Sequence, residues 1–88
     1  MDLIFSPQAW EDYTYWQEAD KRQVKRINAL IRDCMRSPFV GLGKPEALRA
    51  NLQGWWSRRI DEEHRLVYRV AGSADAQRLE IVQCRLHY

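Results

Sequence analysis

The order in which hydrophobic patterns follow one another constrains the fold of this chain more than any other feature. A short strand pattern at residues 2–5 comes first, and two segments with the apolar spacing of helices follow it. Three segments with strand character then complete the chain, at residues 55–60, 65–70 and 79–86. Two helices that precede most of the strands predict an α+β fold, in which both helices pack on an antiparallel meander.

The first helical segment has clear start signals. Ser6 suits the N-cap and Pro7 suits the first position of a helix. Apolar side chains recur after it at spacings of three and four residues, which predicts one face in the core and the other in solvent. The inward residues are Ala9, Trp10, Tyr13 and Trp16, and the outward ones are Glu11, Asp12 and Glu18.

The second helical segment begins at another N-cap candidate. Asp20 is followed three residues later by Gln23, which predicts a capping box in which each side chain binds the other residue's backbone. Ser37-Pro38 ends the helix, because the residue before proline is disfavoured in the helical region. The apolar stripe between these limits consists of Val24, Ile27, Ile31, Cys34 and Met35.

A loop and one further turn separate this helix from the strands. Residues 41–45, with two glycines and a proline, predict the loop, and residues 46–50 predict about one helical turn. Turns at 61–63 and 71–76 then connect the three strands of the meander.

Length and composition limit the class of protein. The 88 residues predict a single domain, residues 1–88, and no apolar run reaches the ~20 residues of a membrane helix. The amino terminus lacks the pattern of a secretion signal. The two cysteines, Cys34 and Cys84, are too few for a disulfide scaffold, so we expect reduced thiols in a cytoplasmic protein.

The charge is distributed unevenly along the chain. Residues 1–20 hold five acidic residues and no Lys or Arg, whereas residues 21–60 hold ten basic residues against two acidic ones. Eleven of the fourteen basic residues are Arg, whose planar fork binds phosphate through two hydrogen bonds at once. A polyanion, with nucleic acid as the first candidate, is therefore a suitable partner, and an ordinary solvated face of salt bridges is the alternative.

Few chemistries are compatible with the residues present. The sequence has no Gly-rich phosphate loop, no paired cysteines and no metal-ligand spacing around its two histidines, so we expect neither a metal nor a cofactor. An isolated carboxylate, several arginines and a terminal His-Tyr remain: Glu46, Arg58, Arg59, Arg65, His87 and Tyr88. Glu, Arg and His could supply the base, the cation and the acid of metal-free RNA cleavage, in which the ribose 2′-hydroxyl is the nucleophile.

Each of these residues also has a structural interpretation. Glu46 could cap a short helix, and Arg65 could pair with the acidic residues of the preceding turn. His64 is expected to be structural, with a hydrogen bond to Glu62 or Glu63. Strand alternation places Arg58 and Arg59 on opposite faces, so only one of them can line a site on a given face of the sheet.

Six sequence blocks resemble the YoeB (Txe) toxins of the RelE superfamily, and together they extend over nearly the whole chain. They are Leu-Ile-Phe-Ser-Pro at 3–7, Asp12-Tyr-x-Tyr-Trp-Gln17, Gly43-Lys-Pro-Glu46, Asn51-Leu-x-Gly-x-Trp-Ser-Arg-Arg-Ile60, Glu62-Glu-His-Arg-Leu-Val-Tyr68 and Cys84-Arg-x-His-Tyr88. The resemblance implies a microbial-RNase-like fold, with two helices packed against a twisted antiparallel sheet. It also implies a type II toxin that cleaves mRNA in the ribosomal A site and thereby inhibits translation. The implied partners are a YefM/Phd-type antitoxin, the ribosome with its mRNA, a second copy of the chain and, only through the antitoxin complex, operator DNA.

The same resemblance assigns roles to individual residues. It implies that Glu46 is the general base, His87 the general acid, Arg65 the main stabiliser of phosphate charge and Tyr88 an aid to alignment. The residues expected to bind phosphate or RNA are Arg59, Arg49 and Lys44. Three positions depart from the family pattern: Leu42 replaces a common Lys, Ala50 a common His and Leu86 a Tyr. The first two departures predict weaker binding of the ribosome or RNA.

Two functions without catalysis remain as alternatives. A basic module that docks on RNA or the ribosome would explain the excess of Arg equally well, but it would not need Glu46, Arg65 and His87 together. A DNA-binding co-repressor that acts with an antitoxin is the other alternative, although no helix-turn-helix pattern is present.

Overall fold

The computed structural model describes residues 1–87. The elements are β1 (Asp2–Phe5), α1 (Pro7–Ala19), α2 (Lys21–Arg36), β2 (Glu46–Ala47), a 3-10 turn (Ala50–Leu52), β3 (Trp56–Arg59), β4 (Arg65–Ala71) and β5 (Arg78–Gln83). The strands form one sheet in the order β1-β5-β4-β3-β2. This arrangement confirms the α+β fold predicted from the sequence.

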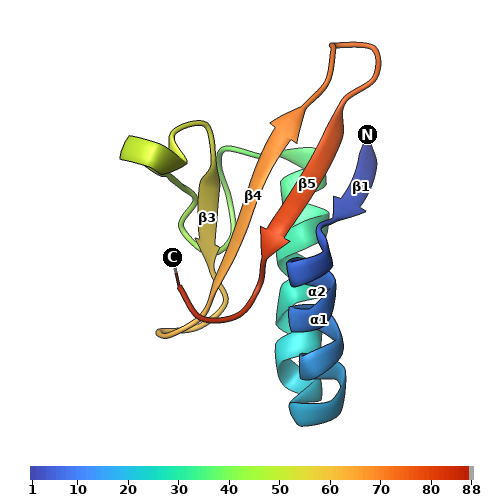
Figure 1. The fold of residues 1–88 in the computed structure, drawn as a ribbon, viewed down its shortest axis with the longest axis vertical. Coiled ribbons are helices and arrows are strands. Elements are labelled where there is room, and N and C mark those ends of the chain that lie inside the picture. Colours follow the sequence, from blue (N-terminus) through green and yellow to red (C-terminus); the bar gives the residue numbers. More distant parts are fainter. Residues whose placement is uncertain (88) are drawn as a thin grey trace.

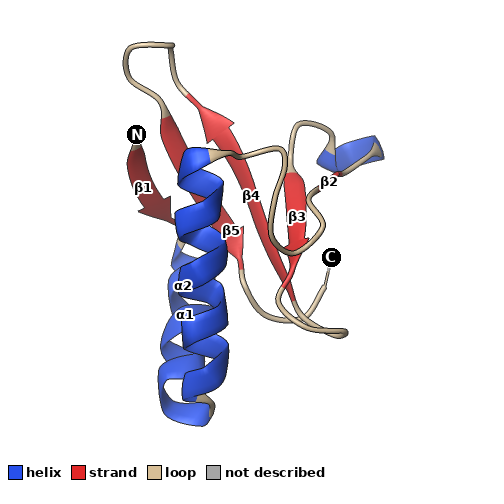
Figure 2. Ribbon diagram, turned by 180° about the vertical axis from the view of Figure 1, so that it is seen from behind, coloured by secondary structure: helices blue, strands red, loops and turns tan. Residues whose placement is uncertain are grey.

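Both helices lie on the same face of the sheet (Figure 1). The view from behind shows them beside β1 and β5, whereas the loop after α2 passes across β3 (Figure 2). Strands β3, β4 and β5 pair antiparallel, as predicted, and β2 adds to them antiparallel, but β1 pairs parallel with β5. The sheet is therefore mixed, and its last strand in the chain runs beside the first in the same direction.

The predicted helix starts are confirmed, with one change. Ser6 Oγ accepts a hydrogen bond from Ala9 N at 3.0 Å, and Asp20 Oδ1 accepts one from Arg22 N at 3.0 Å. The predicted capping box is wrong, because Gln23 Nε2 donates to Asp61 Oδ2 at 2.6 Å instead of returning to Asp20. Gln23 thus ties the start of α2 to the turn between β3 and β4.

The core lies between the helices and the sheet. Its fully buried members are Ala9, Ile27, Leu30, Cys34, Leu66, Tyr68, Leu79 and Cys84. Two predictions for α1 are wrong: Trp10 is 54% exposed, and Asp12 is only 5% exposed. Trp10 lies at the margin of the apolar stripe, against Phe5, whereas Asp12 is turned inward because it accepts hydrogen bonds from Gln8 Nε2 and Cys84 N.

The prediction of a helical turn at residues 46–50 is wrong for its first residues. Glu46 and Ala47 form β2 on the free edge of β3, and Leu48 N continues the contact by donating to Trp55 O at 2.9 Å. Backbone pairing with a strand that lies later in the sequence outweighs the local helical tendency. Strand β5 is also shorter than predicted and ends at Gln83, because Cys84 N donates to the Asp12 carboxylate.

Neither thiol forms a disulfide in the structure. Cys34 and Cys84 are free and buried. Burial raises the pKa of Cys34 to about 11 and that of Cys84 to about 12, so both stay protonated at neutral pH. Within residues 1–87, neither helix has the length and apolar character needed to cross a bilayer.

Candidate functional site

The strand register gathers polar side chains on the sheet face opposite the helices. Glu46 pairs with Ser57, which in turn pairs with Val67, so these three residues form one row across β2, β3 and β4. Arg59 and Arg65 pair in the next row, two residues further along β3. Because alternate residues of a strand share a face and lie about 6.6 Å apart, the carboxylate row and the arginine row are neighbours.

The pairing of Arg59 with Arg65 is unfavourable by itself. Like charges directly opposite each other on adjacent strands destabilise a sheet. The backbone nevertheless places the two residues as partners, with Arg59 exposed and Arg65 half-buried. Such a pair is suited to a bound anion, which would relieve the repulsion.

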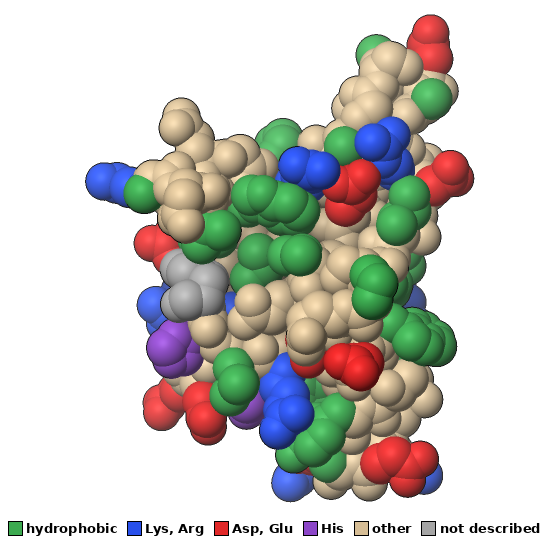
Figure 3. Space-filling view, viewed as in Figure 1, with side chains coloured by type: hydrophobic (Ala, Val, Ile, Leu, Met, Phe, Trp, Pro, Cys, Tyr) green, Lys and Arg blue, Asp and Glu red, His purple; other side chains and the backbone are tan. Residues whose placement is uncertain are grey.

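The two rows form the floor of a depression of about 350 Å³. Its lining residues are Lys44, Pro45, Glu46, Ser57, Arg59 and Arg65. Lys44 enters from the loop with φ 53°, a left-handed conformation that is uncommon for residues other than glycine. The depression therefore combines three cations with one carboxylate, and Figure 3 shows Lys, Arg and His side chains interspersed with Asp and Glu side chains along the left of the molecule.

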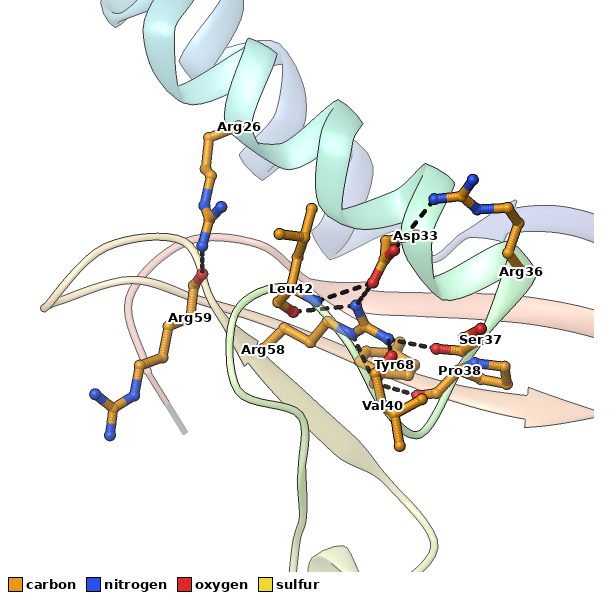
Figure 4. A network of polar contacts seen from close by, with 10 residues as sticks. All are labelled: Arg26, Asp33, Arg36, Ser37, Pro38, Val40, Leu42, Arg58, Arg59 and Tyr68. Carbon is orange, nitrogen blue, oxygen red and sulfur yellow. Dashed lines mark hydrogen bonds and ion pairs between the residues drawn. The ribbon is translucent and has the colours of Figure 1, made fainter.

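A buried arginine holds the loop that carries Lys44. Arg58 points to the opposite side of β3 from Arg59 and is fully buried, as alternation predicts. Its guanidinium donates to Asp33 Oδ2 at 2.5 Å and to the carbonyl oxygens of Ser37, Val40 and Leu42 at 2.6–3.0 Å (Figure 4). Segment 37–43 is thus fixed against the face of β3 from which Arg58 points. In Figure 2 no helix lies over this strand.

Two further contacts complete this support. Tyr68 Oη donates to Pro38 O at 2.6 Å and accepts from Arg58 Nε at 3.2 Å. At the other end of the loop, Arg59 N donates to Gly43 O at 2.7 Å. Gly43 has φ 78°, in the left-handed region, and a Cβ there would lie 3.0 Å from Arg59 O and 2.8 Å from Leu30 Cδ2, so this close approach favours glycine.

The pairing of Asp33 with Arg58 has a consequence for acid stability. The hydrogen bond from Arg58, together with one from Leu42 N, holds the pKa of the Asp33 carboxyl below its ordinary value. The unfolded chain therefore binds this proton first as the pH falls, so the contribution is complete above the unfolded pKa and is lost through the folded pKa. We expect Asp33→Asn to be less stable at neutral pH and to lose less further stability toward about pH 3.

Urea unfolding at a series of pH values, followed by circular dichroism, measures this difference. Glu18→Gln, which neutralises an exposed acid on α1, is the matched control and should retain the native pH dependence. Parallel curves for Asp33→Asn and the native chain would contradict the assignment.

Arg65 is held by the turn that precedes it. Its Nη1 donates to the carbonyl oxygens of Asp61, Glu62 and His64 at 2.8, 3.3 and 3.1 Å. The partners are thus carbonyl groups and not the carboxylates that the alternative interpretation suggested. Carbonyl groups do not neutralise a guanidinium, and no carboxylate within residues 1–87 forms an ion pair with Arg65, so its positive charge is suited to bind a phosphate.

The chain after β5 turns back toward the arginine row (Figure 1). Arg65 N donates to Leu86 O at 2.9 Å, so the peptide group that joins Leu86 to His87 lies against the start of β4. His87 is exposed. Tyr88, the other predicted residue of this segment, lies outside the described residues.

His64 is structural, as expected, but its main partner is different. The ring is buried, and Nδ1 accepts a hydrogen bond from Leu86 N at 2.7 Å. Glu63 Oε1 lies 3.8 Å from Nε2, beyond hydrogen-bond distance, and Glu62 makes no contact with the ring among the described interactions.

Comparison with known proteins agrees with this geometry. The sequence model of the YoeB-like toxins of bacterial type II toxin–antitoxin systems matches residues 5–88. This chain belongs to the YoeB toxin family. It is therefore the toxin of a type II toxin–antitoxin system.

Relatives within the YoeB family match over their full length. Toxin YoeB of Escherichia coli K12 is 59% identical, with both chains covered completely. A YoeB/ParE toxin structure from Agrobacterium tumefaciens has 56% identity, a TM-score of 0.96 and full coverage of both chains. A YoeB–YefM complex from Staphylococcus aureus has 46% identity and a TM-score of 0.86, and covers this chain completely and 98% of its counterpart.

The structure brings together most of the residues that the YoeB resemblance singled out. Lys44, Glu46, Arg59 and Arg65 line one depression. Arg49 does not line it, because this residue precedes the 3-10 turn beyond β2. Ser57 was missed, although its position two residues before Arg59 would have placed it on the same face. Within residues 1–87, no three His, Cys, Asp or Glu side chains group as metal ligands.

Proposed function

We propose that this toxin is a ribosome-dependent endoribonuclease that cleaves mRNA in the ribosomal A site and so inhibits translation. The observation that supports this proposal most strongly is the pair of adjacent rows: one carboxylate, Glu46, beside two facing arginines, Arg59 and Arg65. A base beside two cations suits attack on a phosphodiester.

The reaction needs only groups of the chain and of the RNA. The Glu46 carboxylate takes the proton of a ribose 2′-hydroxyl, whose oxygen then attacks the adjacent phosphorus. Arg65, Arg59 and Lys44 stabilise the additional negative charge on the phosphorane. The bond from phosphorus to the 5′-oxygen breaks, and the protonated His87 ring gives its proton to that oxygen. The products are a 2′,3′-cyclic phosphate and a free 5′-hydroxyl.

The remaining assignments belong to the same proposal. Tyr88 aligns the substrate, and Arg49 contacts RNA or the ribosome outside the depression. Structures from S. aureus contain a YoeB dimer and YoeB–YefM complexes, which supports a homodimer and a YefM/Phd-type antitoxin as partners here. Operator DNA is then contacted only through the antitoxin complex, and the toxin acts in the cytoplasm, where ribosomes translate.

Cleavage on programmed ribosomes tests the proposal. The native toxin and its His87→Ala variant are incubated with ribosomes that carry an end-labelled message, and new 3′ ends are mapped. We expect cuts at the A-site codon with the native toxin and loss of cleavage by orders of magnitude with the variant, because the 5′-oxygen is a poor leaving group without an acid. Both proteins should bind antitoxin equally.

An intact message with inhibited translation would instead support the binding module. Cleavage at the native rate by the His87→Ala variant would remove His87 from the reaction while leaving the nuclease in place.

A further inference from the structure

The residue before His87 has an unusual backbone conformation. Leu86 has φ 63°, in the left-handed region that branched or bulky side chains rarely occupy. Such strain costs free energy and persists only where surrounding contacts enforce it. Both peptide groups that flank Leu86 are in fact held: Leu86 N donates to His64 Nδ1 at 2.7 Å, and Leu86 O accepts from Arg65 N at 2.9 Å.

The hydrogen bond from Leu86 determines the state of the His64 ring. A backbone N–H is always a donor, so Nδ1 must be the unprotonated nitrogen, and the proton of the neutral ring lies on Nε2. The ring is only 9% exposed and packs edge-on against Trp16 of α1, with centroids 4.8 Å apart. It therefore has a fixed position from which to direct Leu86.

The chain just before Leu86 is held equally firmly. Cys84 N donates to Asp12 Oδ2 at 3.0 Å, and Trp16 Nε1 donates to Cys84 O at 2.9 Å. The Arg85 guanidinium stacks on the Tyr15 ring, 3.6 Å from its centroid. Helix α1 thus fixes the segment up to Arg85, and the two contacts on Leu86 direct the chain from there toward the depression.

We propose that neutral His64 is a positioning residue that holds Leu86 in its left-handed conformation and so places His87 beside Arg65 for proton donation to the leaving 5′-oxygen. This inference rests on the proposed nuclease function and extends it. His64 does not touch the reacting atoms. It acts through a single backbone bond, one residue away from the acid.

Charged residues surround His64 and contact its ring or its backbone. Glu63 lies 3.8 Å from Nε2, Asp61 accepts the backbone N–H of His64 at 2.7 Å, and Arg65 binds its carbonyl oxygen at 3.1 Å. From α1 the uncharged Trp16 packs against the ring. A protonated ring would carry a hydrogen on Nδ1, directed at the N–H of Leu86, and this conflict would release the segment.

A pair of substitutions at position 64 tests the role. The amide oxygen of Asn can take the place of Nδ1 as an acceptor, whereas Leu fills the space without an acceptor. On saturating programmed ribosomes we expect His64→Leu to lower the single-turnover cleavage rate by about 100-fold, because misplacing a catalytic group by about 1 Å has that effect. His64→Asn should recover most of the rate, and KM and antitoxin affinity should stay near native in both variants.

Nuclear magnetic resonance gives a second readout that does not depend on the cleavage rate. In the native protein, the ring nitrogens should show the tautomer with the proton on Nε2.

The possible outcomes are distinguishable. Equal cleavage rates for His64→Leu and the native toxin, or a proton found on Nδ1 of the neutral ring, would overturn the positioning role alone. No cleavage by the native toxin would overturn the proposed function and this role with it. A slow His64→Leu variant with no recovery in a folded His64→Asn variant would also overturn it, because the acceptor would then not be the property that matters.

Discussion

Arg58→Met lowers the free energy of unfolding by about 3–5 kcal/mol, the usual cost of removing one partner from a buried charge pair. Methionine has a similar length but no donors, so Asp33 loses its closest partner, and three carbonyl groups of the loop lose theirs. Small domains have only about 5–15 kcal/mol of stability in total. The variant should therefore unfold at a much lower urea concentration, as measured by circular dichroism.

The neighbouring residue provides the control. Arg59→Met changes the same residue type at the next position, but its side chain is exposed and faces another arginine. We expect its stability to stay within about 0.5 kcal/mol of native, because surface changes usually have small effects. Equal losses in the two variants would mean that the strand tolerates no change there and that the Arg58 contacts are not responsible.

Arg65→Met should lower the rate of mRNA cleavage on ribosomes by about 100- to 1,000-fold, the usual effect of removing one group that stabilises charge in a transition state. The cleavage rate of Arg65→Lys should lie between those of the native toxin and Arg65→Met, because an ammonium keeps the charge but lacks the planar fork. The measurement is the single-turnover rate of appearance of cut message at saturating ribosome concentration.

Arg22→Met is the matched control for net charge. Arg22 lies on α2 with its side chain 95% exposed, away from the depression. It should cleave at the native rate if the effect at position 65 is local. A similar loss in both variants would indicate that overall positive charge, and hence docking on the ribosome, limits the reaction.

Local signals in the sequence were sufficient for much of the fold. Ser6 and Asp20 cap the two helices because their side chains act on backbone groups only two or three residues away. Alternation correctly placed Arg58 and Arg59 on opposite faces of β3, although it could not show which face was buried. In each case the determining contact depends on spacing that can be read along the chain.

The errors share a different physical origin. Asp12 is buried because of Cys84, 72 positions later in the sequence, and Glu46 is in a strand because β3 offers an unpaired edge. Gln23 likewise donates its side-chain hydrogen bond to Asp61 and not to Asp20, the predicted partner. Long-range hydrogen bonds decide these positions, and helical periodicity carries no information about them. The candidate site was predictable in residue type, whereas its shape depends on strand register.

The bonds between α1 and the segment after β5 also govern when a newly made chain can become harmful. Asp12 and Trp16 both hydrogen-bond to the backbone of Cys84, and β1 pairs with β5. During synthesis, both helices are complete long before Cys84 and β5 leave the ribosomal exit tunnel. The pairing of the two ends of the chain is therefore a late step of folding. During translation of its own message, the toxin thus lacks the framework that holds Leu86 and His87.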